Sequence, residues 1–338
     1  MKRIGVFVLG AILLTTTALR AQAAPDPLVV TASNESLNQL LVFSSTGALL
    51  HQIPTGGQGG VGGNAGGVTV SGGTVAVVNF GSSTVTLFER TGDTFTTTQT
   101  LGTASAAVSV AFSKDHLYVL GTTTIESHRR GENAIDQAPD GIATLVQADG
   151  SAAQVGVAGD QLVISEKSNT VETVALRGGA VTGPTQSVAL PPNSNAPFGL
   201  VTRGANAYVT IAHSDEVSLI KNGRLVALVA TGTPGGGGQH APCWIAVVGP
   251  YLFTANSPSR SISRLVATGN NVVIDELVAA TTIGAPTDIA AVDGLVAVVD
   301  GDASGSRVTQ FSVSADGTLT PVSRASIAAP INGIGIVR

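Results

Sequence analysis

The chain of 338 residues has a single cysteine, Cys243, so it cannot form an intramolecular disulfide. Charged residues make up only 12% and aromatic residues only 4%. Acidic residues outnumber basic ones by 22 to 17, which argues against a nucleic-acid partner, because such a partner requires a basic face. Stability must therefore come from packing and from closure of the fold.

Long apolar runs are also missing after the N-terminal region, where nothing approaches the roughly 18 residues of a membrane span. The first 23 residues have the pattern of a secretory signal: the basic Lys2 and Arg3, an apolar stretch at 4–14, and a small-x-small site at 21–23. We therefore expect cleavage before Ala24 and a periplasmic or secreted protein with no membrane span. Because the signal carries three basic residues and no acidic one, cleavage changes the net charge from −5 to −8.

The sequence does contain an internal repeat. The segment "IAVVGPYLFTAN" recurs in pattern, and successive copies begin 42, 45, 45, 45, 44 and 45 residues apart. We call the first apolar residue of each copy its anchor; the anchors are Val68, Val110, Val155, Leu200, Ile245, Ile289 and Ile334. Alternating apolar residues around a polar turn, followed by two more alternating runs, indicate short strands. Four strands at a period of about 44 residues are typical of a β-propeller blade.

The two ends of the chain predict the number of blades. The stretch "LVVTASNESLNQLLVF" matches the second and third strands of a copy but lacks a first strand, whereas the C-terminal "INGIGIVR" is a first strand alone. We therefore predict an all-β, seven-bladed β-propeller with four-stranded antiparallel blades, forming one domain over 24–338. The C-terminal strand should pair into the N-terminal blade, because an open ring would leave a sheet edge and two blade faces exposed.

The copy from Pro242 to Leu265, with "IAV", a turn, "LFTAN" and "SIS" in that order, resembles YVTN-type repeats. It is similar to the repeats of lactonase-like seven-bladed propellers, a superfamily with 6-phosphogluconolactonase-like and carboxymuconate-cyclase-like members. The resemblance covers nearly the whole mature chain, and it implies the fold and a lactonase-like activity. No lactonase catalytic residue matches a position in this sequence. The chain also departs from the WD-repeat pattern, since no Asp follows Trp244.

Fold-level analogy places a propeller's ligand at the mouth formed by two sets of loops. The first set leads into the innermost strands, and the second follows the second strands. Candidate residues in the first set are Asn64, His240, Cys243, Trp244, Asp288 and Asn332. Candidates in the second set are Asn34, Asn79, Glu166, Asn256 and Asp300, with His213 two residues beyond the equivalent position.

Three of these residues are catalytic candidates: Glu166, His213 and His240, because a carboxylate or an imidazole can activate water. If Glu166, Asp300 and nearby Asn residues converge, their oxygens could hold a divalent cation such as Ca²⁺, an arrangement that resembles the carboxylate and amide cluster of the metal-dependent lactonase propellers. Cys243 near His240 suggests a nucleophile and its base. The alternative for Cys243 is a small buried hydrophobic residue.

Five residues are binding candidates: Asn79, Trp244, Asn256, Asp288 and Asp300. The Asn and Asp residues have an alternative interpretation, because these residue types favour tight turns. Two glycine-rich stretches, 55–67 and 231–240, each precede an anchor. Neither has the Gly-Lys-Ser/Thr of a phosphate-binding loop, so we expect flexible loops over the same mouth.

Two functional hypotheses follow. The first is a hydrolase that acts on a small-molecule lactone or ester at the mouth of the central channel. The second is a non-catalytic propeller of the cell envelope that binds a protein, a peptide or a glycan. Both hypotheses include a monomer with no nucleic-acid partner.

Overall fold

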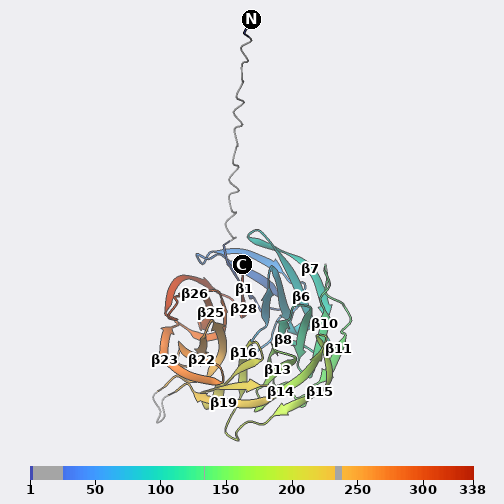
Figure 1. Ribbon diagram of the computed structural model, residues 1–338, viewed down its shortest axis with the longest axis vertical. Helices are drawn as coiled ribbons and strands as arrows, with labels where there is room; N and C mark the ends of the chain where they lie inside the picture. The colour runs from blue at the N-terminus through green and yellow to red at the C-terminus, as the bar shows by residue number, and fades with distance from the viewer. Residues whose placement is uncertain (3–25, 133, 233–237) are drawn as a thin grey trace.

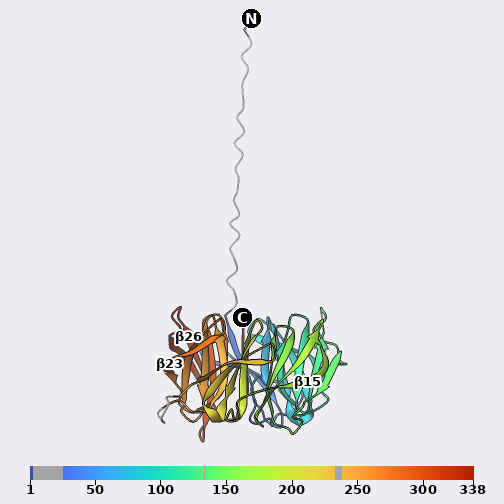
Figure 2. The same cartoon turned by 60° about the horizontal axis from the view of Figure 1, so that its bottom comes forward.

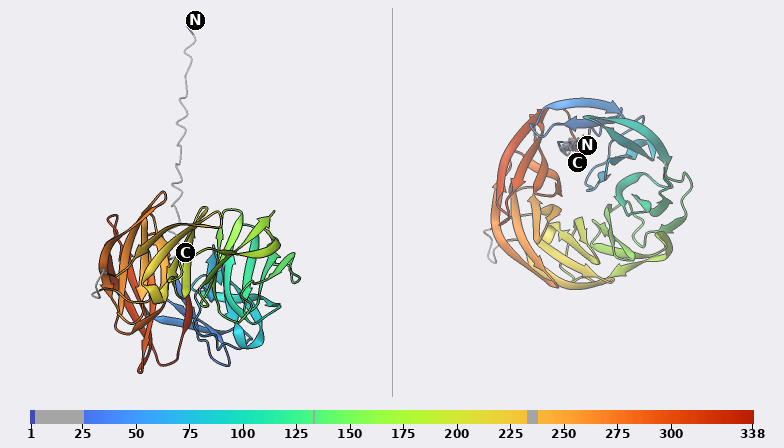
Figure 3. Two further views of the ribbon diagram at one scale, coloured as in Figure 1. Left: turned by 90° about the horizontal axis from the view of Figure 1, so that it is seen from below. Right: turned by 45° about the horizontal axis from the view of Figure 1, so that its top comes forward.

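The computed structural model describes residues 1–2, 26–132, 134–232 and 238–338. Residues 3–23 of the predicted signal peptide therefore lie outside the described residues. The described strands form seven sheets of four antiparallel strands, arranged around one axis as a ring (Figure 1; Figure 3, right). From the side, the ring is a short drum (Figure 2). Within the part of the chain described, no helix has the length and hydropathy needed to cross a membrane.

Each sheet is one blade, and its strands follow one another from the axis outward. Blade 1 consists of β28 (Asn332–Val337), β1 (Leu28–Ala32), β2 (Gln39–Phe43) and β3 (Leu49–Pro54). Blade 2 consists of β4 (Val68–Ser71), β5 (Thr74–Asn79), β6 (Thr84–Thr91) and β7 (Thr94–Gly102). Blade 3 consists of β8 (Ala107–Phe112), β9 (His116–Gly121), β10 (Thr124–Arg129) and β11 (Gly141–Thr144).

The remaining four blades repeat this order. Blade 4 consists of β12 (Ala152–Ala158), β13 (Gln161–Glu166), β14 (Thr170–Arg177) and β15 (Ala180–Val188). Blade 5 consists of β16 (Pro197–Arg203), β17 (Asn206–Ile211), β18 (Glu216–Lys221) and β19 (Arg224–Ala230). Blade 6 consists of β20 (Pro242–Val248), β21 (Tyr251–Asn256), β22 (Ser261–Thr268) and β23 (Asn271–Thr281). Blade 7 consists of β24 (Ala285–Val292), β25 (Leu295–Asp302), β26 (Gly305–Val313) and β27 (Leu319–Ile327).

Every anchor of the sequence repeat lies in an innermost strand, which confirms the predicted blade frame and the number of blades. Two single 3₁₀ turns interrupt the pattern, η1 (Phe80–Ser82) and η2 (Ala212–Ser214), each after a second strand. The apolar side chains fill the contacts between neighbouring blades. For example, Tyr118 and Leu120 of blade 3 pack with Leu162 and Ile164 of blade 4. Stability is therefore distributed around the ring, as in other repeat proteins.

The two ends of the chain join in blade 1. Strand β28 pairs antiparallel with β1, and the register places Leu28 opposite Val337 and Thr31 opposite Ile334. Ile334 and Ile336 are buried in a cluster that also contains Val299 of blade 7. The C-terminal strand thus completes the first blade and seals it against the last one, as the sequence predicts.

Deletion of residues 331–338 should abolish stable folding or lower the melting temperature sharply. It removes the buried side chains of Ile331, Ile334, Ile336 and Val337. Each such side chain contributes about 1.5–3 kcal/mol by burial, and a domain is stable by only about 5–15 kcal/mol in total. Differential scanning calorimetry measures the change. The control is Val322→Ala in the outermost strand β27, where the side chain is 53% exposed. A truncated chain that melts with the full-length protein would contradict the closure.

Candidate functional site in the central channel

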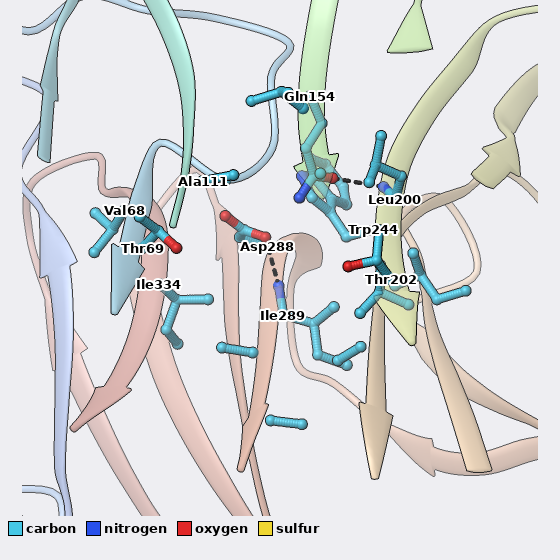
Figure 4. Close-up of a pocket in the computed structure, with 18 of the residues that line it drawn as sticks. Val68, Thr69, Ala111, Gln154, Leu200, Thr202, Trp244, Asp288, Ile289 and Ile334 are labelled. Carbon is cyan, nitrogen blue, oxygen red and sulfur yellow. Dashed lines mark hydrogen bonds between the residues drawn. The ribbon is translucent and has the colours of Figure 1, made fainter. Parts of the chain in front are cut away.

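The seven innermost strands surround a central cavity of about 350 Å³. All seven anchors of the repeat line it: Val68, Val110, Val155, Leu200, Ile245, Ile289 and Ile334. Four of them are labelled in Figure 4, together with the polar side chains of the cavity. The periodic apolar residue that defines the sequence repeat is therefore also the residue that forms the channel wall.

One end of the channel is closed by the glycine-rich stretch 55–67, and Asn64 is at its centre. The Asn64 side chain donates from Nδ2 to the carbonyl of Val108 in blade 3 (2.7 Å) and accepts at Oδ1 from Asn332 in blade 1 (2.9 Å). Its backbone carbonyl accepts from the indole Nε1 of Trp244 in blade 6 (3.1 Å). Asn64 itself is 1% exposed. One residue thus bridges three blades across the axis.

Neighbouring residues hold the same stretch in place. The Lys167 ammonium donates to the Gly63 carbonyl (2.6 Å), and the N–H of Ala65 donates to Ala153 of blade 4 (3.2 Å). The stretch also requires small residues: a Cβ on Gly59 would lie 2.4 Å from the backbone of Asn34. It therefore forms a fixed plug, unlike the flexible loop that its composition predicts. The second glycine-rich stretch lies partly outside the described residues, at 233–237.

The other end of the channel opens on the face formed by the hairpins between first and second strands. Towards these hairpins the lining residues become partly exposed, among them Val70, Val157, Thr202, Val247 and Ala291. The cavity is therefore blind: it is open at the hairpin face and closed by the plug.

The position before the anchor supplies the polar groups at the closed end. In six blades the pairing of the first two strands shifts within the two residues before the anchor. Such bulges redirect side chains. The residues at this position are Gly67, Ser109, Gln154, Gly199, Trp244, Asp288 and Gly333. Gln154, Trp244 and Asp288 line the cavity, so the chemistry of the closed end varies from blade to blade within one frame.

Asp288 is the ionisable side chain of the cavity lining, and it is only 5% exposed. Its Oδ1 accepts from the N–H of Ile289 (2.8 Å). Burial raises the pKa of Asp288 to about 7, against the opposing effect of hydrogen bonds from the backbone of Ile289, Gly66 and Ile334. A carboxyl of this kind exchanges its proton near neutral pH.

Gln154 faces the same end of the cavity. Its Oε1 accepts from the N–H of Leu200 (2.5 Å), so the amide is oriented with Nε2 as the group left to donate (Figure 4). A Cβ on Gly66 would lie 3.0 Å from this Nε2, and the backbone of Gly66 also hydrogen-bonds Asp288. The amide of Gln154 and the carboxyl of Asp288 therefore both lie next to Gly66. Sequence reasoning missed Gln154, although alignment on the anchors places it level with Trp244 and Asp288.

Trp244 is the third side chain of this group. Its ring meets that of Phe198 edge to face, with centroids 5.3 Å apart and planes at 82°. Its Nε1 donates to the plug, so the indole is held by the contact with Phe198 and by this hydrogen bond. Of the five predicted binding residues, Trp244 and Asp288 line the cavity.

The side chains of the other three predicted binding residues form hydrogen bonds within the protein, inside one blade or between two blades. Asn79 accepts at Oδ1 from Asn38 (2.9 Å) and Thr55 (2.7 Å), and it donates to Thr86 (2.9 Å). Asn256 donates to Ser261 and Ser263, at 3.2 and 2.8 Å. These amides lie in networks that hold strands together, through side chains rather than through their own backbone.

Asp300, the last of the five, forms a buried ion pair. Its Oδ1 accepts from Arg307 Nη1 (3.0 Å) and from the N–H of Gly284 (2.7 Å). The same guanidinium also reaches Asp302, which is 2.6 Å away. Asp300 therefore stabilises the end of blade 7.

The three predicted catalytic residues lie outside the cavity lining. Glu166 is fully buried at the end of β13, where it accepts from the Ser151 hydroxyl (3.0 Å). His213 is exposed on η2. His240 is 55% exposed, and its Nδ1 lies 2.8 Å from Asp215. The structure does not bring these three side chains together with one another in one cavity.

The predicted metal site would need Glu166 and Asp300 to converge. They lie in blades 4 and 7, each with its own partners. Among the described residues, no group of three His, Cys, Asp or Glu side chains could hold a metal ion. The residues present therefore do not fit a Ca²⁺ site built from this pair.

Cys243 behaves as the alternative interpretation predicts. Burial, together with a smaller effect of the Asp215 charge, raises the pKa of its thiol to about 12. The thiolate that a nucleophile requires is thus disfavoured at neutral pH.

Comparison with known proteins finds similar folds among solved structures, whereas no family model and no curated protein matches the chain. A protein from Lactobacillus plantarum has a TM-score of 0.68 at 14% identity, over 93% of this chain and all of its own. A candidate 6-phosphogluconolactonase from Bacteroides fragilis has a TM-score of 0.65 at 13% identity, over 94% and 100% of the two chains. A periplasmic gluconolactonase from Pseudomonas aeruginosa has a TM-score of 0.64 at 15% identity, over 93% and 99%. The chain therefore has the fold of the lactonase-like propellers.

Replacement of Asn64 by alanine should loosen the plug. The buried carbonyl of Val108 and the partly buried amide of Asn332 lose their hydrogen bonds, at a cost of up to about 1–3 kcal/mol each. Denaturant unfolding should show this loss, and the emission of Trp244 should shift to longer wavelength as water reaches the indole. Asn270→Ala, in an exposed turn, is the control. An unchanged emission maximum and unchanged stability would show that the plug does not depend on Asn64.

Glu166→Gln should alter the pH dependence of stability. Burial raises the pKa of Glu166 from 4.5 to about 8. The stability that the protonated carboxyl contributes is present below pH 4.5 and is lost as the pH rises through 8. Glutamine stays neutral at every pH. The free energy of unfolding of the variant, relative to that of the wild type, should therefore rise between pH 4 and pH 9 by on the order of a few kcal/mol. Urea unfolding at both pH values measures this; parallel pH curves would contradict the assignment.

Proposed function

We propose that the protein is a lactonase-like hydrolase that opens a small lactone or ester inside the central channel, with Asp288 as the general base. The observation that carries the proposal is the closed end of the cavity, where a carboxyl with a pKa of about 7 and an amide donor both lie next to Gly66. A blind cavity of about 350 Å³ suits a small molecule. The lactonase names of two structural neighbours support the same class of substrate.

The proposed reaction uses these two side chains in turn. The Asp288 carboxylate takes a proton from a water molecule as the water oxygen attacks the carbonyl carbon of the lactone. The Gln154 amide donates to the carbonyl oxygen, on which negative charge develops. The ring C–O bond then breaks, and the proton on Asp288 passes to the leaving alkoxide. The product is the open hydroxy acid, and Asp288 is again ionised.

The electrostatics of the closed end suit this role. Seclusion from water by the plug strengthens the amide-to-oxyanion hydrogen bond. The raised pKa makes Asp288 a stronger base than an exposed aspartate, while leaving it about half ionised near pH 7. The rate should therefore rise with pH and level off above about 7.

The second candidate is a non-catalytic propeller that binds a protein, a peptide or a glycan. It is favoured by the position of His213 and His240, which lie exposed outside the cavity lining, and by the high thiol pKa of Cys243. Asp288 is the one ionisable side chain among the described residues that line the cavity, so no second acid or base lies beside it there. Specific binding without turnover of any lactone would select this candidate.

A location outside the cytoplasm belongs to the same proposal. The signal-like pattern of residues 1–23 supports it. The periplasmic location in the name of the Pseudomonas aeruginosa neighbour is consistent with it.

Asp288→Asn should lower kcat for glucono-1,5-lactone by about 10²–10⁴-fold, the usual contribution of a general base. Asparagine keeps the shape of the side chain but cannot take the proton. Initial rates are measured with a pH indicator after subtraction of spontaneous hydrolysis. The wild-type rate should fall on acidification through about pH 7, and the variant should lose this dependence.

Asp93→Asn is the matched control, because this carboxyl is 74% exposed in a turn of blade 2. It should leave the rate unchanged. Full activity in Asp288→Asn, together with loss of activity in Glu166→Gln or His240→Ala, would move the chemistry out of the channel.

A further inference from the structure

The channel wall is polar because of its backbone. Each innermost strand pairs with only one neighbour, so its inner edge presents N–H and C=O groups to the axis. At the closed end some of these groups are bonded, for example the N–H of Val110 to Gly66 and that of Leu200 to Gln154. Farther out, at 111–112, 156–157 and 201–202, the described backbone has only the ladder bonds to its own blade. These edges are left for water or for a ligand.

The charge of the wall is equally distinctive. The residues that line this cavity in the described structure include no Lys, Arg or His, and Asp288 is their one acidic side chain. An adjoining pocket shares Val68 and Ile334 with the cavity, and Asp293 and Arg338 line that pocket at the rim. At the rim, Arg338 donates to the carbonyl of Asp293 (2.6 Å) and faces its carboxylate at 4.0 Å. Arg203 is turned away onto Tyr208, with its guanidinium 5.6 Å from the ring centroid. The positive charges nearest the channel are therefore already paired or turned outward.

We infer that the channel takes an uncharged, hydroxyl-rich molecule and excludes the phosphorylated or carboxylated form of the same molecule. Hydroxyl groups both donate and accept, so they match the mixed N–H and C=O groups of the inner strand edges. Inside the cavity an anion would lose its water without meeting a cation, because Arg338 lies at the rim and is bonded to Asp293. It would also approach the Asp288 carboxyl. The plug closes one end, so the molecule enters from the hairpin face. That this molecule is a lactone rests on the proposed function. That it is uncharged follows from the cavity wall alone.

The single tryptophan provides the assay. Trp244 is the only tryptophan of the chain and lines the cavity, so intrinsic fluorescence reports on occupancy of the channel. The probes are glucono-1,5-lactam, which is neutral and is not hydrolysed as a lactone is, and its 6-phosphate. The lactam should change the emission saturably at pH 7.5. The phosphate should bind at least about tenfold more weakly, which corresponds to about 1.4 kcal/mol.

A pair of variants tests the electrostatic cause. Thr202→Lys places an ammonium in the channel wall and should raise the affinity for the phosphate relative to the lactam by about tenfold or more. Thr202→Met is a matched neutral side chain of similar length and should leave the preference unchanged. Thr69→Lys, on the wall across the channel in Figure 4, repeats the test if Thr202→Lys does not fold. Circular dichroism and melting curves confirm the fold of each variant.

The outcomes separate the inference from the proposed function. Saturable binding of the lactam with exclusion of the phosphate upholds the inference, even where no lactone is turned over. Equal affinity for both probes, tighter binding of the phosphate, or no saturable response to the lactam would overturn it, even where lactones are hydrolysed. An unchanged preference in a folded lysine variant would also overturn it.

Discussion

The antiparallel pairing of β28 with β1 is the constraint on which the rest of the structure depends. It joins residues more than 300 positions apart and converts a row of sheets into a closed ring. Only in a closed ring do all seven innermost strands turn their free edges toward one axis. The channel, its backbone-lined wall and the position of the polar residues at one end all follow from this closure.

Within that ring, each copy of the repeat has one position that forms the channel wall and a neighbouring position that varies in its chemistry. The anchors are apolar in every copy and form the wall. The residue before each anchor, redirected by a bulge in most blades, differs from copy to copy: it is glycine in three blades and Ser109, Gln154, Trp244 or Asp288 in the others. Gly67 and Gly333 leave room for the plug, and Gly199 leaves room for the backbone of Cys243 and Trp244 in blade 6. The larger side chains give the closed end its amide, its indole and its carboxyl.

Sequence reasoning predicted the fold because the fold depends on local patterns. Alternation, turn residues and a period of about 44 residues are visible in one dimension, and the incomplete copies at the two ends predict the closure. The candidate site was predicted only in part. Asp288 and Trp244 were among the candidates because they precede anchors. Glu166 and Asp300 were candidates because of their charge. Their partners, Ser151 and Arg307, cannot be identified from the sequence, because the contacts depend on the three-dimensional structure.

The plug could not be predicted for a similar reason. Glycine-rich composition is typical of mobile loops, and the contacts that fix 55–67 come from Val108, Lys167, Trp244 and Asn332, which are distant in sequence. Gln154 was missed although it holds the same position before an anchor as Trp244 and Asp288. Its role depends on the bond from Leu200 in the next blade, which orients it.

The central claim is that the working site lies inside the channel, beneath the plug. The most direct measurement is a crystal structure of the protein soaked with the neutral glucono-1,5-lactam. This account predicts the ring at the closed end of the channel, hydrogen-bonded to Asp288 and Gln154 and to the inner edges of the strands. A ring bound instead at the opposite face, beside His240 and Asp215, with the channel filled by water alone, would contradict it.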